Sequence, residues 1–576
     1  MGNSRTMPAE VSEVSEVRAA SSGITRRDFL KFGGAGLAGV GLLGTAGCGV
    51  FSGGQGGDGG GSGGSGGSGG NTLNGYLPQD IPDMSSTTTT DTNSFSLLAN
   101  TNEGLYRLDE NEEPQPAQAE SVDVSSDKLT YTFKLRDGIT WSNGDPVTSQ
   151  DFKYAWLRAM DPETSGEYAY IIADFVEGGS EFSGGDGSEG DVAIDAPDDK
   201  TLEVRLVNPA PYFLGLMAFP TYFPLNQKFV EQQGDSFAQG ADSLLYNGPY
   251  KFTEFDPAGG VKLEKNQDYW DASNVGIQNI NLDVIKEANT ALNLYETGDL
   301  DYARITADKA DRYADNPDVA SIPEFSSFYF TLNIEDPVIS NRNIRKAIQL
   351  GFNSQDYVDT VLNDDSIPAT GLVPEKVSSG AEGTTFREMA GDPINGFDVD
   401  QAQEYWAKGV EELGEKPTLS LLTTDDTVGQ DSATFMQNQL KKNLGAEIEI
   451  EQVPFSTALD RQGNGDFQVS LATGWGADYD DPMTFLDLWT SGSDFNYANF
   501  DNEEYDQLIA DAKAESDFEE RAEMLVQAEK LLIADGAALA PNYYRVTNYL
   551  QKQYIENPVR HPYGAEFDFK YWKLNK

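Results

Sequence analysis

Alternating apolar and polar positions predict β-strands in the first half of the chain. Two stretches show the pattern: residues 129–135 (LTYTFKL) and residues 201–206 (TLEVRL). A strand buried on one face has this alternation, because successive side chains point to opposite sides of the sheet. Both stretches are therefore expected to be half-buried strands.

Helical spacing of apolar residues occurs in two other places. Residues 518–534 carry apolar side chains three and four positions apart, which predicts a helix. A second helix is expected to begin at Ser149 or Asp151, because either side chain can cap a helix N-terminus. Its apolar stripe consists of Phe152, Ala155, Trp156 and Ala159.

This mixture of strands and helices predicts a multi-lobed α/β protein. The chain has 576 residues, which is too long for one ordinary core and suits roughly two to four packed lobes. Hydrophobic residues make up 38% and aromatic residues 11% of the chain, enough for globular interiors.

The formal net charge of −54 narrows the range of partners. Nucleic acid and anionic membrane surfaces would repel so negative a chain, so neither is expected as a partner. The charge is expected to keep the surface soluble in ion-rich surroundings. An acidic surface that binds a cationic partner is the alternative.

The first 47 residues resemble an export signal. Residues 25–31 (TRRDFLK) place Arg26 and Arg27 in the pattern of the twin-arginine motif, S/T-R-R-x-F-L-K. The apolar, glycine-rich residues 32–47 have the length of a signal-peptide core and are too short to span a membrane as a mature helix. Residues 1–47 are therefore expected to be a twin-arginine-type lipoprotein signal peptide.

The only cysteine, Cys48, follows this signal directly. Residues 45–48 (TAGC) resemble a lipobox, whose cysteine is diacylated on sulfur and becomes the first residue of the mature protein; Thr45 stands where such signals usually have Leu. Residues 48–71 are rich in Gly and Ser and are expected to form a flexible tether. The protein is thus expected to be exported and lipid-anchored at the outer face of the cytoplasmic membrane.

Catalytic and metal-binding residue sets are scarce. The single histidine, His561, lies outside every motif, so a Ser-His-Asp or Cys-His arrangement would depend on a residue expected to be packed or on the surface. No Walker A sequence or His-based metal cluster occurs. The 94 Asp and Glu residues leave a glycoside hydrolase open by count alone. We expect no enzyme activity, no cofactor and no metal site.

Several motifs in colinear order carry a resemblance to a known family. Residues 127–156 (DKLTYTFKLRDGITWSNGDPVTSQDFKYAW) closely resemble the signature of the peptide/nickel class (family 5) of extracytoplasmic solute-binding proteins of ABC importers. Further matches are residues 102–105 (NEGL), 246–251 (YNGPYK), 263–270 (LEKNQDYW), 341–348 (NRNIRKAI) and 474–486 (GWGADYDDPMTFL). The last resembles the oligopeptide-binding branch.

The resemblance implies an α/β, two-lobed clamshell of the periplasmic-binding-protein type (type II-like, cluster C) with an additional domain on one lobe. It divides the chain into lobe I (72–115, about 212–283 and about 544–576), the additional domain (about 116–211) and lobe II (about 284–543). Most of the signature is expected to shape the fold rather than contact ligand: Trp141, Gly144, Pro146 and Asp151, with Asn341, Arg345 and Ala347 later on.

The resemblance also implies ligand-binding residues. Asp478 matches the aspartate that pairs with a peptide's free α-ammonium group, and a carboxylate in a water-poor cleft suits such a cation. The alternative is that Asp478 caps a turn before Pro482. Gly474 and Gly476 would permit close approach of ligand backbone. The other expected contacts are Trp475 as an apolar wall, Ala477, Glu103, Gly104, Leu105, Asn247, Gly248, Tyr250 and Tyr168, with a structural turn as the alternative for residues 247–250.

The expected function is capture of short peptides by a monomeric protein, followed by delivery to the permease and ATPase subunits of an ABC importer. Two alternatives remain at this point. The same fold carries nickel chelates, oligosaccharides or haem in other relatives, although scarce histidine argues against nickel. A surface peptide sensor would use the clamshell without feeding a transporter.

Overall fold

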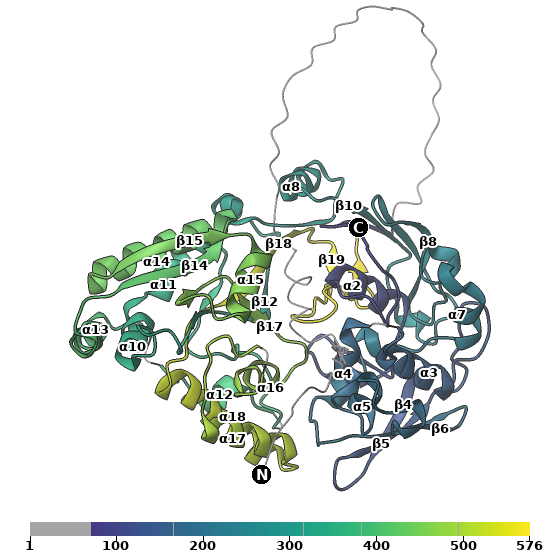
Figure 1. The fold of residues 1–576 in the computed structure, drawn as a ribbon. Helices are drawn as coiled ribbons and strands as arrows, with labels where there is room; N and C mark the ends of the chain where they lie inside the picture. Colours follow the sequence, from purple (N-terminus) through teal and green to yellow (C-terminus); the bar gives the residue numbers. More distant parts are fainter. Residues whose placement is uncertain (1–70, 165, 315, 382, 395, 494) are drawn as a thin grey trace, which may run out of the picture.

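The computed structural model describes residues 71–576 except 165, 315, 382, 395 and 494. Three separate β-sheets of four or more strands and the helices around them form two masses that face each other (Figure 1). Within this described part, no helix combines the length and the apolar composition of a membrane span. Cys48, Arg26 and Arg27 lie outside the described residues, so their expected roles stay predictions.

The first sheet joins the start of the described chain to its middle. Its order is β1 (Thr72–Leu77), β10 (Asn279–Val284), β9 (Gly260–Lys265) and β8 (Tyr250–Asp256), with β1 and β10 parallel. Its core also contains residues of α2 (Thr92–Thr101), α8 (Ala288–Thr297), β11 (Tyr302–Arg304) and the C-terminal pair β19 (Ile555–Glu556) and β20 (Lys573–Leu574).

The second sheet contains both strands that alternation predicts. Its antiparallel order is β4 (Ala119–Val124), β5 (Thr130–Leu135), β7 (Thr201–Arg205) and β6 (Ile194–Asp198). Around it lie the short pair β2 (Tyr106–Leu108) and β3 (Pro114–Pro116) and the helices α3 (Ser149–Met160), α4 (Tyr170–Ala173), α5 (Gly179–Ser183), α6 (Phe213–Leu216) and α7 (Gln227–Gln233). The predicted strands are confirmed as the central neighbours β5 and β7.

Helix α3 begins where predicted, and of the two predicted capping residues Asp151 takes part in a capping box whereas Ser149 does not. Thr148 is the N-cap residue, and the side chain of Asp151 accepts a hydrogen bond from the Thr148 backbone N–H at 2.8 Å. Ser149 is the first helical residue, and its hydroxyl donates instead to the Asp198 carbonyl. The pattern located the helix, but a Thr-Ser pair leaves the choice of cap to the backbone turn before it.

The third sheet is mixed, with both parallel and antiparallel strand pairs. Its order is β11, β18 (Leu539–Gln551), β12 (Val319–Leu332), β16 (Val469–Ser470), β14 (Thr418–Thr424) and β15 (Glu447–Val453), with β13 (Ile367–Pro368) on β18 and β17 (Gly474–Gly476) on β12. The helices packed with it are α10 (Arg342–Gly351), α11 (Ser354–Tyr357), α13 (Val399–Leu413) and α14 (Thr427–Leu444), and α15 (Phe455–Gly463) contacts β14. Asn341 caps α10, as the sequence predicts for a helix start.

Two long strands connect the first and third cores. Strands β12 and β18 run antiparallel, from the pair Val319–Leu550 to the pair Thr331–Leu539. Leu550 is buried in the core of the first sheet, whereas Ala540 is buried in that of the third. The ladder shifts register between Pro323 and Ser327, at the level between the two cores.

The predicted helix at 518–534 is confirmed as α18 (Phe518–Glu529), which continues as a π-helical segment, Lys530–Asp535. It packs with α17 (Glu503–Ala514), α16 (Met483–Leu486) and α12 (Phe386–Ala390). Where the chain divides into lobes stays a prediction. Residues of α8 and β11, which the sequence prediction assigns to lobe II, are buried in the core of the first sheet.

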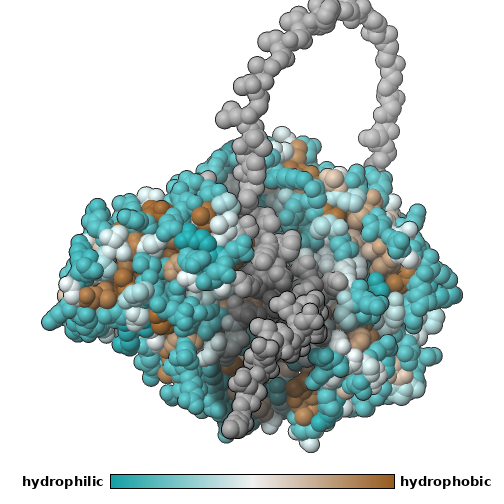
Figure 2. All heavy atoms as spheres, in the orientation of Figure 1, coloured by the Kyte–Doolittle hydropathy of each residue, from teal (hydrophilic) through white to brown (hydrophobic). Residues whose placement is uncertain are grey.

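The exposed surface is mainly hydrophilic. On the face shown in Figure 2, hydrophobic residues of the described part are scattered among hydrophilic ones. Among the described residues, the large hydrophobic side chains that are exposed are Val124, Val207, Phe397 and Val428. A surface of this kind agrees with the net charge of −54.

Candidate functional site

A cavity of about 210 Å³ lies where distant parts of the chain meet. Its walls come from segments 99–114, 211–223, 378–380, 478–480 and 561–568. The predicted residues Glu103, Gly104 and Asp478 are among them. The cavity therefore brings together two motifs that lie more than 370 residues apart in the sequence.

Asp478 is held at the cavity wall by its own backbone. Strand β17 pairs with β12, and the Ala477 N–H then donates to the Phe325 carbonyl at 2.7 Å. The next N–H, that of Asp478, donates to the Thr484 hydroxyl at 3.2 Å. These two consecutive N–H groups fix the backbone that leads into Asp478, which is buried at the wall with 8% of its surface exposed.

The residues before Asp478 have different environments. A Cβ on Gly474 would lie 2.6 Å from a Phe328 ring carbon, so this glycine is required by packing against β12. A Cβ on Gly476 would meet nothing within 4 Å. Trp475 is buried and packs edge-on against Phe495 at 5.4 Å. Gly474, Trp475, Gly476 and Ala477 are not among the residues that line the cavity.

Glu103 lines the cavity and also anchors a junction of two motifs. The Asn247 side chain accepts from the Glu103 N–H at 3.1 Å and donates to the Glu103 carbonyl at 2.9 Å. The Glu103 carboxylate accepts from Trp270 Nε1 at 2.6 Å and from Gln118 Nε2 at 2.8 Å, and from the Tyr269 hydroxyl. These bonds tie segments 102–105, 246–251 and 263–270 into one buried unit.

The other predicted contacts lie outside the cavity lining. Leu105 and Tyr250 are fully buried, and the Tyr250 hydroxyl donates to the Phe569 carbonyl at 3.2 Å. A Cβ on Gly248 would lie 2.7 Å from the Asn102 backbone, so this glycine permits close packing. Tyr168 is buried among aromatic rings, edge-on to Phe95 at 5.2 Å. Their proposed contact with ligand stays a prediction.

Sequence reasoning missed the part of the wall that the C-terminal segment supplies. His561 is buried with 8% of its surface exposed, with Nδ1 2.7 Å from Glu112 and Nε2 3.6 Å from Asp568. Burial lowers the pKa of His561, but the two carboxylates outweigh this effect and raise it to about 9. The histidine is therefore a buried cation at neutral pH.

Asp568 is held by Arg107 as well. The Arg107 guanidinium donates to both carboxylate oxygens, at 2.6 and 2.8 Å. Burial opposes ionisation of Asp568, but Arg107 and the neighbouring His561 hold its pKa well below the usual range. The only signal of this network in the sequence is the presence of one histidine in an acidic chain.

A second ion pair lies behind the Asp478 loop. Asp481 and Arg521 are both buried, and the guanidinium donates to the two carboxylate oxygens at 2.8 and 2.9 Å. Asp480 lines the cavity, and the Ser378 N–H donates to it at 2.7 Å. Burial, followed by the charges of Asp481, Glu112 and Glu113, raises the pKa of Asp480 to about 7.

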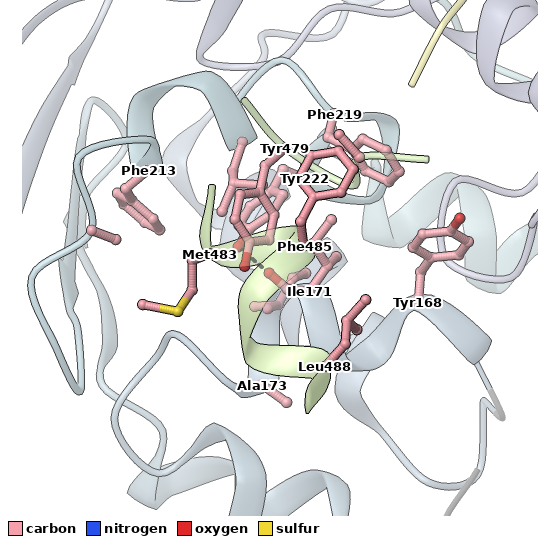
Figure 3. Packing of buried hydrophobic residues seen from close by; sticks show 14 of the residues in the cluster. Tyr168, Ile171, Ala173, Phe213, Phe219, Tyr222, Tyr479, Met483, Phe485 and Leu488 are labelled. Atoms are coloured by element: carbon pink, nitrogen blue, oxygen red, sulfur yellow. Dashed lines mark hydrogen bonds between the residues drawn. The ribbon is translucent and has the colours of Figure 1, made fainter. Parts of the chain in front are cut away.

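Aromatic rings from both sides of the cavity are in contact. Tyr479 stacks on Tyr212 at 4.2 Å with an angle of 11° between the rings, and Phe175 packs edge-on against it. Figure 3 shows Tyr479, Met483 and Phe485 in the buried cluster that includes Phe213 and Tyr222. The stack therefore joins the loop of Asp478 to the segment before α6.

A cavity between two facing masses, lined by carboxylates and aromatic rings, defines the molecule as a two-lobed solute-binding protein. The family model described as bacterial extracellular solute-binding proteins, family 5, matches residues 113–497. The chain belongs to this family. Its proteins bind and transport solutes and are not enzymes, and the family resemblance and the fold class expected from the sequence are confirmed.

Named relatives agree on this class. The dipeptide-binding protein DppE of Bacillus subtilis is 34% identical over 82% of this chain and 86% of its own length. The oligopeptide-binding protein OppA of the same organism is 33% identical over 81% and 86%. The solved structure of Listeria monocytogenes OppA bound to peptide shares 38% identity and a TM-score of 0.71, over 88% of this chain and all of that one.

Proposed function

We propose that this protein captures short peptides by their free N-terminus and delivers them to an ABC importer. The observation that carries the proposal is the position of Asp478, a buried carboxylate fixed in the wall of the cavity. The names of the relatives, dipeptide- and oligopeptide-binding proteins, support peptides as the ligand class. A carboxylate in this setting forms a charge-assisted hydrogen bond with an ammonium group.

The remaining predicted contacts differ in their position relative to the cavity. Glu103 and Gly104 line the cavity, and Gly476 leaves open space in front of its backbone. We propose that these three positions contact the ligand or lie beside it. For Trp475, Ala477 and the residues of segments 102–105 and 246–251 that lie behind the wall, the observed contacts support a role in holding the cavity in shape.

The test is calorimetric binding of one short peptide in its free and N-acetylated forms. We expect the free form to bind about tenfold to a hundredfold more tightly, because a hydrogen bond to a charged group contributes about 1.5–3 kcal/mol. In the Asp478→Asn variant the two forms should bind alike. The control variant is Asp431→Asn, at an exposed position on α14. It removes the same charge elsewhere and should leave the difference in affinity between the free and acetylated peptides intact. Equal binding of both forms by the wild-type protein would remove the role of Asp478.

Anchoring and delivery complete the proposal. We propose that residues 1–47 direct export by the twin-arginine route, that Cys48 carries the lipid, and that residues 48–71 tether the folded part to the outer face of the cytoplasmic membrane. The monomer then presents its ligand to the permease, which works with the ATPase subunits. Membership of an extracellular solute-binding family supports this location and these partners.

A further inference from the structure

The charged residues of the cavity wall are strongly unequal in sign. Among the described lining residues, the cations are Arg107 and His561. The carboxylates that line the same cavity are Glu103, Glu112, Glu113, Asp478, Asp480 and Asp568. A small, partly enclosed space with this composition has a negative potential, because low-dielectric walls reduce screening.

Both cations are already engaged by neighbouring carboxylates. Arg107 binds Asp568 through two hydrogen bonds and lies 3.6 Å from Glu103. His561 lies 2.7 Å from Glu112 and 3.6 Å from Asp568. The described lining residues therefore offer no further cation to Asp480 and Glu113.

These two carboxylates come from segments of the cavity wall that are far apart in the sequence. Asp480 belongs to the loop after β17, where the Ser378 N–H holds one of its oxygens. Glu113 belongs to the turn between β2 and β3, next to Glu112, whose backbone has a φ of 64°. Asp480 is close enough to this turn to feel its charge, since its pKa is raised first by burial and then by carboxylates that include Glu112 and Glu113.

Apolar surface lies beside the carboxylates. The cavity is also lined by Tyr212, Phe219, Tyr479 and Tyr563. A lysine or arginine side chain has a long apolar stem and a charged head, so it can pack its stem on rings while the head reaches a carboxylate. The cavity offers both aromatic rings for the stem and carboxylates for the charged head.

We propose that the cavity selects peptides that carry a cationic side chain, with the charged head between Asp480 and the Glu112–Glu113 turn. The inference deepens the proposed function and rests on it. It concerns a second charge on the ligand, in addition to the α-ammonium group assigned to Asp478.

The test compares tripeptides that differ in one charge. Alanine tripeptides with lysine at position one, two or three are titrated calorimetrically beside the same peptides with norleucine, which keeps the stem and lacks the charge. At one or more positions lysine should bind at least about fivefold more tightly than norleucine. A glutamate tripeptide should bind more weakly than both.

Variants assign the preference to the two wall segments. Asp480→Asn keeps an oxygen that can accept from the Ser378 N–H, and Glu113→Gln changes an exposed residue, so both should fold. Each variant should reduce the ratio of lysine-peptide affinity to norleucine-peptide affinity about threefold or more, while the affinity for the norleucine peptide stays constant. Glu404→Gln, on the exposed face of α13, removes the same charge far from the cavity and should change nothing.

The outcomes separate this inference from the proposed function. If norleucine peptides bind and lysine gives no advantage at any position, the charge selection is overturned while peptide capture stands. A preference that survives the Asp480→Asn and Glu113→Gln double variant overturns the assigned position. If no unblocked peptide binds, peptide capture itself fails.

A pH series adds an independent readout. The groups that act on Asp480 are Asp481 with its partner Arg521, Glu112, Glu113 and Tyr563, and the same cavity is lined by Asp478 and His561. Asp480 has a pKa of about 7, so its charge changes between pH 6 and pH 8. Glu566, next to the lining residue Ala565, also has a pKa of about 7, so the same series on Asp480→Asn is the control. A bound cation favours the ionised form, so the lysine preference should rise up to about tenfold over this interval. A preference that is flat with pH, or that falls, contradicts the position beside Asp480.

Discussion

His561 links the charge of the cavity wall to the stability of the folded protein. Its ring lies between Glu112 and Asp568, and its pKa is raised to about 9 in the folded state, against about 6.5 in an unfolded chain. A raised pKa means that the folded state holds this proton more tightly. The stabilisation is therefore complete below pH 6.5 and is lost as the pH rises through 9.

We expect the free energy of unfolding to fall by about 3 kcal/mol between pH 6.5 and pH 9 from this residue. The measurement is chemical denaturation of the wild type and of His561→Gln over that interval. The difference between the two proteins isolates the histidine, because other titrating groups such as Lys346 contribute to both curves. If the free energy of unfolding changed with pH in the same way for both proteins, His561 would not hold an additional proton in the folded state.

At this scale the sequence predicts some of the site and misses the rest for a physical reason. Asp478 could be predicted because it lies in a short motif whose residues are neighbours along the chain. His561 and Asp568 reach Arg107 and Glu112 across more than 440 positions, and no local pattern encodes such a contact. Asp480 lay within the predicted motif, but its pKa is raised first by burial and then by charges that include Glu112 and Glu113, which are far away in the sequence.

Strand β17 is the element that positions the Asp478 loop, and its two glycines serve different purposes. A Cβ at Gly474 would lie 2.6 Å from the Phe328 ring and 2.7 Å from the Ser327 carbonyl oxygen. Gly476 faces open space. The pairing of β17 with β12 should therefore depend on the first glycine and not on the second.

Thermal unfolding of two alanine variants tests this difference. Gly474→Ala should lose about 1–3 kcal/mol, since the added carbon overpacks a buried strand pair. Gly476→Ala should change stability by less than about 0.5 kcal/mol. Equal losses in both variants would contradict the observed packing.

Elements were predictable where one face is buried. The alternation at 129–135 and 201–206 gives β5 and β7, because each buries one side against the core of the second sheet. The short strand β17 and the π-helical end of α18 carry no such signal. Their conformation is determined by neighbours in space, such as β12, rather than by a pattern of apolar residues in their own sequence.

The whole molecule combines a hydrophilic folded body with the proposed anchor. In the part of the chain that the structure describes, no helix is long and apolar enough to span a membrane. The proposed attachment is through Cys48. A diacyl group provides two chains, which suffice for stable anchoring, whereas a single chain gives only reversible binding.

The full-length protein, expressed in a host that acylates lipoproteins, should therefore enter the detergent phase on Triton X-114 partitioning. Its Cys48→Ser variant should stay in the aqueous phase and retain the same peptide affinity. Intact mass measurement reports the acyl groups directly. A wild-type protein with an unmodified thiol in the aqueous phase would refute the anchor.

The pairing of distant segments also determines when the protein can complete its fold. Strand β1 pairs with β10 some 207 residues later, and Asn100 donates to the carbonyl of Phe567, 467 residues away. The core of the first sheet includes Phe567, Phe569 and Trp572. A ribosome must therefore have synthesised nearly the whole chain before this core can close. The core of the first sheet can therefore close only after Trp572 has left the ribosome, an order that suits the proposed twin-arginine route, which exports folded proteins.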